Sequence, residues 1–401
     1  MSSFIKHLLQ LRTTLRPRAL LRPRALLLPL LFAALLLSLE GCVVHEFPKE
    51  DTPVGIDLEF KFNTAFLPFK EVDYTQQQKA TTSACIMRYI VRAYPMAADG
   101  SIAETPLKEY LFTKAQLEEP DLKVSIEIPE GRYLLKCWFD YISATAQNDN
   151  FYHTSNFEKI TLTEPYTGDT DYKDAFIGER EIICIRGSKE TPNPLYTLEM
   201  ERPLAKFQFV AVDFGEFVNK IMQETLSPEE YQDYLNKKYG GKNPTNNLYN
   251  GYTVEISERD LLWNNTSKAP WDPTQTPGFD PEDYKVVFQY TSFVPNTYNL
   301  MLKKPVDAFL GYKFNATISP VNSEEARIGM DYILINGTES SVNLQVLLYS
   351  PKGELLSTSN PVKVPMVRGK ITTIRGKFLT LQIDGGISLD TDFDGEINIV
   401  I

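Results

Sequence analysis

The chain has 401 residues, of which 43% are hydrophobic, 12% aromatic and 23% charged. This is the composition of a globular protein long enough for two domains, and it excludes a disordered tail. Residues 1–41 carry six basic residues and one acid, or +5, so the remainder carries 35 basic minus 51 acidic residues, or −16. A body this acidic repels phosphate backbones, so we expect no nucleic-acid partner.

The basic first segment leads into an apolar run at residues 25–39. Fifteen residues at about 1.5 Å each fall short of a roughly 30 Å bilayer core, which favours the hydrophobic region of a signal peptide over a permanent span. Leu39-Glu40-Gly41-Cys42 then places a small residue directly before a cysteine and resembles a bacterial lipobox. We predict that residues 1–41 are removed and that the thiol of Cys42 is acylated, for example with palmitate.

Several acyl chains hold a protein on a membrane more stably than one chain does. Val43 follows the cysteine, in place of the aspartate associated with retention in the inner membrane. We therefore expect a lipid anchor in the outer membrane, with the protein facing the cell surface. Residues 42–53 are polar and contain prolines, and they are interpreted as a tether between the lipid and the fold.

Alternation of apolar and polar residues dominates the rest of the chain. In residues 54–63, Ile56, Leu58, Phe60 and Phe62 share one face, which predicts a half-buried strand. The same signals predict strands at 87–95, 121–128, 132–141, 159–164, 176–187, 196–214, 285–293, 297–304, 312–319, 331–337, 342–350, 360–367 and 370–379. So many short strands predict an all-β protein built from β-sandwiches.

We divide the chain into an N-terminal sandwich at 54–198 and a C-terminal sandwich at 199–401. Within the first, Pro129-Glu130-Gly131 is a tight-turn signal, and it predicts that the strands on either side pair as a hairpin.

One helix is predicted from its capping residues. Ser227-Pro228-Glu229-Glu230 provides an N-cap, a proline at the first helical position and a capping glutamate, and Gly240 ends the helix. Its surroundings, about residues 219–284, are rich in Asn, Pro and Tyr. We interpret them as a small helical insertion in the C-terminal sandwich.

The sequence offers little material for catalysis. The predicted mature chain has two histidines, His45 and His153, and it lacks the GxSxG, Walker A and GxGxxG motifs. We therefore predict no catalytic residues, no cofactor and no enzymatic activity, although paired carboxylates have no fixed spacing and stay open as an alternative.

Asp390, Asp392 and Asp394 precede Gly395 and reproduce the opening of a calcium loop, but the twelfth position is Ile401 instead of a bidentate glutamate. We expect a polar turn there and no metal site.

Three cysteines follow the lipobox, namely Cys85, Cys137 and Cys184. An odd number in strand-like surroundings predicts buried thiols and no disulfide framework.

Trp263 and Trp271 lie in the predicted insertion. If the two rings are exposed, they would form a stacking platform for a sugar or a protein. If they are buried, they would pack the insertion against the sandwich. Both interpretations stay open.

Several longer phrases complete the pattern: EGRYLLKCWFDY at 130–141, DAFIGE at 174–179, MERPLAKFQFVAVDF at 200–214, DYILINGTESSVNLQVLLYSPKGELL at 331–356, VPMVRGKITTIRGKFLT at 364–380 and FDGEINIVI at 393–401. Together with the lipobox, their order resembles the fimbrillin-like surface lipoproteins, which include the pilin and anchor relatives of type V pili. The resemblance implies two transthyretin-like β-sandwich domains in tandem on the outer membrane, without enzymatic activity.

The resemblance also implies assembly with pilin subunits by strand complementation, in which a protease removes a pilin's first strand after an arginine. This chain has no arginine between Cys42 and Arg88, and a cut after Arg88 or Arg92 would fall within a predicted strand. We therefore expect a structural or adhesive lipoprotein that keeps its first strand, as a pilus anchor or accessory subunit. A glycan-binding surface lipoprotein associated with nutrient uptake is the alternative.

Overall fold

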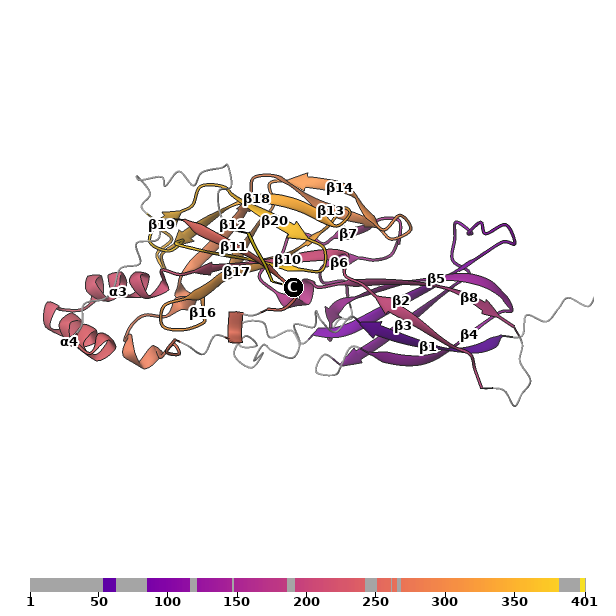
Figure 1. Cartoon of the computed structure of the whole chain (residues 1–401), viewed down its shortest axis with the longest axis horizontal. Helices are drawn as coiled ribbons and strands as arrows, with labels where there is room; N and C mark the ends of the chain where they lie inside the picture. The colour runs from indigo at the N-terminus through magenta and orange to yellow at the C-terminus, as the bar shows by residue number, and fades with distance from the viewer. Residues whose placement is uncertain are drawn as a thin grey trace, which may run out of the picture. The chain divides into compact units, whose positions relative to one another are not determined.

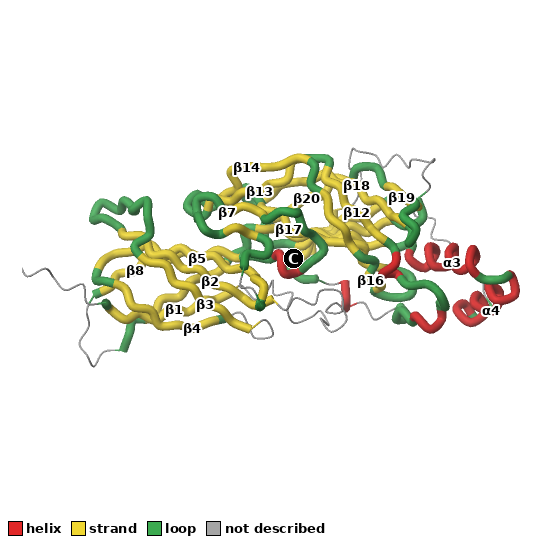
Figure 2. The backbone as a smooth tube through the Cα atoms, turned by 180° about the vertical axis from the view of Figure 1, so that it is seen from behind, coloured by secondary structure: helices red, strands yellow, loops and turns green. Residues whose placement is uncertain are grey.

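The computed structural model describes residues 53–62, 85–115, 121–145, 148–185, 192–241, 251–260, 262–264, 268–381 and 397–400. Strands dominate these residues and group into five sheets, with only two α-helices among them. The all-β prediction is confirmed. Figures 1 and 2 show the strands and the helices from opposite sides.

The first described strands form a sandwich of two sheets. The three-stranded sheet has the order β4-β1-β9, and the four-stranded sheet has the order β3-β2-β5-β8. The bounds are β1 Val54–Phe62, β2 Cys85–Pro95, β3 Lys108–Ala115, β4 Leu122–Ile128, β5 Gly131–Ser143, β8 Phe176–Cys184 and β9 Leu195–Met200. Apolar side chains from both sheets meet in one core, where those of β1 lie against those of β2 and β5.

A second sandwich follows along the chain. Its larger sheet has the order β16-β17-β10-β21-β11-β22, and the facing sheet has the order β15-β12-β18-β19, with β20 also paired to β18. The bounds are β10 Leu204–Ala211, β11 Tyr252–Ser257, β12 Lys285–Tyr290, β15 Lys313–Ala316, β16 Ser319–Pro320, β17 Ala326–Leu334, β18 Glu339–Tyr349, β19 Leu355–Thr358, β20 Val362–Val367, β21 Ile371–Gly376 and β22 Ile397–Val400. The largest hydrophobic cluster among the described residues fills the space between these sheets.

A fifth sheet combines strands that are far apart in the sequence. Its order is β14-β13-β7-β6. The bounds are β6 Tyr152–His153, β7 Ile160–Leu162, β13 Phe293–Asn299 and β14 Lys304–Leu310. A third apolar cluster joins the same parts of the chain, because Trp138 of β5 packs with Tyr298 of β13 at a ring-centroid distance of 6.2 Å.

The helices lie together near the second sandwich and are red in Figure 2. They are α3 Phe214–Thr225 and α4 Pro228–Tyr239, with short 3-10 turns η3 Asp171–Lys173, η4 Leu262–Asn264, η5 Pro273–Gln275 and η6 Pro281–Asp283. The capping prediction for α4 is confirmed. Ser227 and Glu230 form a complete capping box, and Gly240 adopts the left-handed conformation after the last turn.

The predicted hairpin between β4 and β5 is wrong. β4 pairs with β1, whereas β5 pairs with β2 and β8 in the opposite sheet. The connection at 129–130 is therefore an arch between sheets. This arrangement lets Ile126 and Ile128 of β4 face Leu135 and Phe139 of β5 across one core, whereas a hairpin would have placed the two apolar rows side by side.

Other predicted strands are interrupted, among them 285–293, 312–319, 297–304 and 196–214. Residues 300–303 of the predicted strand 297–304 form a turn between β13 and β14, because Asn299 Oδ1 accepts a hydrogen bond from the backbone N–H of Leu302 at 2.9 Å. The predicted strand 196–214 divides into β9 and β10. Pro203 lies between them and has no N–H to donate to a ladder.

Helix α3 and strands β3, β6, β11, β14 and β19 were not predicted. Phe214, Phe217, Val218 and Met222 recur at helical spacing and are buried. Asp213 is the N-cap of α3, but its side chain makes no hydrogen bond to the first turn of the helix. It accepts hydrogen bonds from the backbone at 378–380 instead, so the capping pattern that marks the start of a helix is missing. β11 lies inside the expected insertion at 219–284, yet it pairs with β21 within the larger sheet.

Candidate functional site

The first described strand, β1, lies between two neighbours. It pairs antiparallel with β4 from Val54↔Ile128 to Phe60↔Leu122, and parallel with β9 from Asp57↔Leu195 to Phe62↔Met200. Both edges of its backbone are therefore used for ladder hydrogen bonds. We call the space that β1 fills between β4 and β9 the β1 slot.

The inner face of β1 is completely covered. Ile56, Leu58 and Phe60 are 0% exposed and Phe62 is 5% exposed. The Phe60 ring packs 5.2 Å from that of Tyr89, centroid to centroid, and the Phe62 ring lies 5.0 Å from Phe139. Aromatic contacts of this kind add to the free energy gained from burial alone. The strand prediction for residues 54–63 is confirmed, together with its apolar face.

The outer face of β1 is polar and binds both neighbours. Asp57 Oδ1 accepts hydrogen bonds from Ser125 Oγ of β4 at 2.6 Å and from Asn193 Nδ2, just before β9, at 3.2 Å. These two bonds lower the pKa of the exposed Asp57 carboxyl. Glu59 pairs with Lys123 of β4 at 2.8 Å. Side chains as well as backbone therefore set the position of β1.

Side chains also connect the open edges of the two sheets around the β1 slot. Lys108 Nζ and Tyr110 OH of β3 donate to the backbone carbonyl of Glu127 in β4, at 2.8 and 2.6 Å. On the other side, Tyr196 OH of β9 donates to the carbonyl of Ile183 in β8 at 2.7 Å. Exposed strand edges attract further strands, and such contacts occupy part of that hydrogen-bonding capacity.

A pocket opens where β1 ends. It has a volume of about 590 Å³ and is lined by Phe62, Gly178, Glu179, Glu199, Met200, Glu201 and Lys303. Backbone hydrogen bonds between Ile177 and Glu201 join β8 to the chain after β9 beside it. The pocket therefore lies beside the bridge between β8 and the chain after β9, at the end of the β1 slot.

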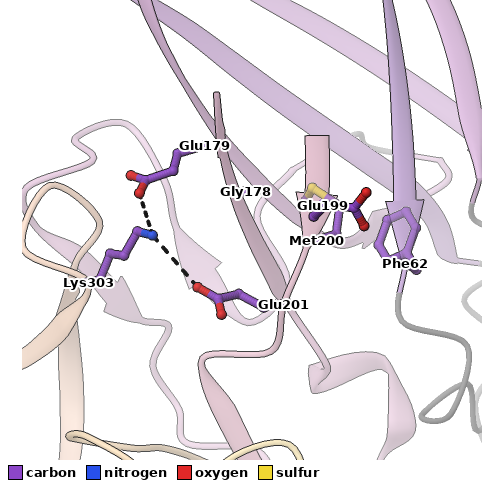
Figure 3. A pocket seen from close by; sticks show the side chains of 7 residues that line it. All are labelled: Phe62, Gly178, Glu179, Glu199, Met200, Glu201 and Lys303. Carbon is purple, nitrogen blue, oxygen red and sulfur yellow. Dashed lines mark ion pairs between the residues drawn. The ribbon is translucent and has the colours of Figure 1, made fainter. Parts of the chain in front are cut away.

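Lys303 carries the positive charge of this pocket. It lies in the β13–β14 turn with φ 51°, in the left-handed region. Figure 3 shows its side chain directed toward Glu179 and Glu201, with N–O distances of 2.5 and 3.8 Å. Glu179 also pairs with Lys136. Partial burial disfavours the Glu179 carboxylate, but the two lysines outweigh it and lower its pKa. Sequence analysis missed this site because its residues come from four separate segments.

A second polar group, also missed, is buried around η3, β10 and β17. Lys173 Nζ bonds to Asp331 Oδ1 at 2.7 Å, Lys206 Nζ bonds to Asp171 Oδ1 at 2.7 Å, and the Arg202 guanidinium binds both oxygens of Asp174. We call these six residues the ionic cluster. Tyr166 OH and Tyr290 OH each donate to Asp331 Oδ2 at 2.6 Å. Three cations balance three anions, which is the condition for charges to be tolerated away from water.

The sequence of the whole folded region assigns it to a family. A model of a family of unknown function, DUF6562, matches residues 51–401. The chain belongs to the DUF6562 family. No curated protein matches it.

Solved structures similar to this DUF6562 protein include three fimbrial proteins. The fimbrial anchor protein Mfa2 of Porphyromonas gingivalis is 9% identical, with 77% of this chain and 82% of that chain covered and a TM-score of 0.29. The tip fimbrial protein Mfa3 of the same organism is 8% identical, with 78% and 81% covered and a TM-score of 0.30. A fimbrial assembly protein of Parabacteroides distasonis is 12% identical, with 81% and 91% covered and a TM-score of 0.29. Because TM-scores this low do not define a function, we base the proposal below on this chain's own residues.

The predicted lipid-attachment residue of the DUF6562 protein, Cys42, lies outside the described residues, as does the loop at 390–395. No helix in the described part of the chain is long and apolar enough to cross a membrane. The described residues also contain no group of His, Cys, Asp and Glu that could hold a metal ion.

The two predicted platform tryptophans are half-buried. Trp271 packs against Phe214 at 5.1 Å and Phe279 at 6.0 Å between ring centroids. Trp263, in η4, has the guanidinium of Arg327 5.7 Å from its ring. These contacts favour the packing interpretation for Trp271, and a role in ligand binding stays a prediction for both.

Cys85, Cys137 and Cys184 are buried and form no disulfide. Burial raises the pKa of the Cys184 thiol to about 11 and that of Cys137 further. Both thiols are therefore protonated at neutral pH and poorly nucleophilic.

Proposed function

We propose that this DUF6562 protein is a lipid-anchored surface protein of the fimbrillin type, with a structural or adhesive role as a pilus anchor or accessory subunit that keeps its own first strand. The lipobox at Cys42 and the order of the fimbrillin-like phrases support the assignment to that class. The observation that carries the proposal is the central position of β1, with its inner face completely buried.

Burial of β1 has a large energetic effect. Four large apolar side chains each gain roughly 1.5 to 3 kcal/mol on full burial, or about 6 to 12 kcal/mol together before ordering costs. That range is comparable to the whole stability of a domain. A subunit that lost β1 would need another chain to fill the β1 slot, because β4 and β9 would both lose their ladder partner.

The first arginines after Cys42 are poor sites for cleavage. Arg88 and Arg92 both lie within β2, and they are 7% and 9% exposed. Arg88 is bonded to Asp140 of β5 at 2.8 and 2.6 Å, and Arg92 to Glu109 of β3 at 2.6 Å. A protease would have to unfold the four-stranded sheet to reach either peptide bond. This supports a subunit whose β1 stays in place.

Membrane attachment and partner capture test the assignment. In a detergent-phase separation of whole membranes, we expect the natural protein in the detergent phase and Cys42→Ala in the aqueous phase. Protein extracted mildly from the surface should copurify with fimbrial subunits. Detergent partitioning that is independent of Cys42 would contradict the anchor. Saturable glycan binding without any fimbrial partner would favour the glycan-binding alternative.

A further inference from the structure

The exposed large apolar side chains of the described residues are not scattered. Eleven Ile, Leu, Val and Phe residues are more than two-fifths exposed, and they fall mainly into two groups. One group of five lies on β13, β14 and their connection: Phe293, Leu302, Val306, Phe309 and Leu310. Another five lie on the N-terminal sandwich: Ile102, Leu107, Ile183, Ile185 and Leu195. The remaining residue, Leu111, lies on β3.

The second group gathers at one end of the N-terminal sandwich. At that end β1 begins, with Val54 opposite Ile128, and β8 ends, with Cys184 opposite Gly131. Ile183 and Ile185 flank Cys184, and they are 52% and 70% exposed. We call the end of the sandwich that carries Val54 the anchor end.

The remaining three residues lie at the same end. Leu195 begins β9 and pairs with Asp57 of β1. Ile102 bridges to Met96, whose backbone N–H donates to the carbonyl of Arg132 at the start of β5 at 2.9 Å. Leu107 N–H donates to the Ala93 carbonyl at 2.8 Å. The loop between β2 and β3, which carries Ile102, projects beyond the strands in Figure 1.

The short distance along the chain between this group and the proposed lipid indicates that the membrane is what covers the exposed apolar side chains. Cys42 precedes Val54 by twelve residues, a span of at most about 40 Å at roughly 3.3 to 3.6 Å per residue. β5 has 13 residues, so the opposite end of the sandwich lies about 40 Å farther along the strands. An acylated Cys42 therefore holds Val54 within about 40 Å of the bilayer, whereas the opposite end of the sandwich can extend to about 80 Å from it.

We propose that the anchor end is a membrane-contacting surface on which Ile102, Leu107, Ile183, Ile185 and Leu195 insert between lipid headgroups. This rests on the proposed lipid anchor at Cys42 and goes beyond it, because it gives the folded domain a fixed orientation on the membrane. Exposed apolar side chains at a membrane interface gain free energy by leaving water.

Electrostatic attraction contributes little to this contact. The anchor end carries Asp99, Glu104 and Glu130, and Arg132 is already paired with Glu181 at 3.9 Å. Among the described residues of this end, Lys108 donates to the Glu127 carbonyl, and the basic side chains form no cluster of the kind that binds anionic lipids. We therefore expect contact with zwitterionic phosphatidylcholine, and we expect it to persist in high salt.

A depth measurement tests the surface. The acylated full chain carries an environment-sensitive fluorophore at Ser101→Cys, in the β2–β3 loop, or at Lys352→Cys, in the β18–β19 turn of the other sandwich. The protein is reconstituted in phosphatidylcholine vesicles containing spin-labelled lipid. We expect the probe at residue 101 to be quenched several-fold more strongly than the probe at residue 352. Equal quenching at the two positions would overturn the proposal.

A variant with serine at all five positions provides the matched test of the apolar contact. These side chains are exposed, so the fold should be retained, and circular dichroism checks this. We expect the variant to float with vesicles as the parent does but to lose most of the quenching at residue 101. Quenching at residue 101 that persists in this variant would contradict membrane contact through these side chains. A change in the fluorescence of the probe that occurs only when the protein self-associates would contradict it too. Failure of the parent to float would instead contradict the lipid anchor, and both proposals would then fall.

Discussion

The first and the last described strands occupy opposite kinds of position. β1 is the middle strand of a three-stranded sheet and has ladders on both sides, whereas β22 pairs only with β11, at the edge of a six-stranded sheet. Removal of β22 would leave five strands joined by their own ladders. Removal of β1 would leave β4 and β9 without a partner. The same kind of element, a strand with a parallel neighbour, is therefore central to one sheet and lies at the edge of another.

The largest effect is expected at the centre of the β1 slot. Phe60→Asp replaces a fully buried ring by a carboxylate, and loss of the ring alone costs about 3 to 5 kcal/mol, to which burial of a charge adds. We expect the N-terminal sandwich to be largely unfolded. Urea denaturation followed by tryptophan fluorescence, to which Trp138 contributes from β5, measures this. Lys61→Gln, at a position whose side chain is 51% exposed, is the control in the same strand and should unfold as the parent does.

The ionic cluster tests how far the two sandwiches depend on each other. Lys173→Met leaves the Asp331 carboxylate buried without its cation, and breaking a buried pair in this way costs about 3 to 5 kcal/mol. Hydrogen exchange should accelerate in both β8 and β17. The double variant Lys173→Met with Asp331→Asn removes both charges and should recover much of the loss. Destabilisation confined to β17 would show that the cluster does not couple the two sandwiches.

The edge position of β22 predicts a smaller effect. A chain ending at Leu381 loses one ladder and retains the rest of its sheet. We expect the thermal midpoint to fall by no more than about 4 °C, as for a change near 1 kcal/mol in a domain of this size. Differential scanning calorimetry measures the midpoint. A fall as large as that caused by Phe60→Asp would remove the asymmetry between the two strands.

The pocket at the end of β1 predicts the smallest effect, and it depends on pH. Lys136 and Lys303 lower the pKa of Glu179. A lowered folded-state pKa stabilises the protein above the unfolded value, near 4.5, and this stabilisation disappears as the pH falls through the folded value. The urea midpoint of the parent should exceed that of Glu179→Gln at neutral pH, and the difference should vanish in acid. A difference in urea midpoint that stays the same at all pH values would show that Glu179 acts through packing and not through its charge.

Local patterns predicted the strands well and their partners poorly. The alternation around Ile56 and Phe60 identifies β1 because burial on one face leaves a period of two in the sequence. The sequence does not distinguish a hairpin from an arch at residues 129–130, because the alternating apolar residues of β4 are compatible with both connections. That choice depends on which core the row faces.

The candidate sites show the same limit. The pocket residues Phe62, Glu179 and Lys303 come from three segments, and each reads as an ordinary surface or strand residue by itself. The six residues of the ionic cluster are likewise spread from Asp171 to Asp331, and no local pattern marks them as buried. The capping residues Ser227 and Glu230 could be predicted from the sequence because they interact within one turn of the same helix. Only the fold brings the distant groups together.

The N-terminus of the protein on the cell surface tests the central claim most directly. Surface-exposed protein is isolated with any attached acyl chains retained. Its intact mass and its N-terminal peptides are then determined by mass spectrometry. We expect one dominant form that begins at an acylated Cys42 and contains residues 54–62. A dominant form that begins after residue 63, recovered in a ladder of oligomers, would show that the β1 slot is filled by another subunit and would contradict a retained first strand.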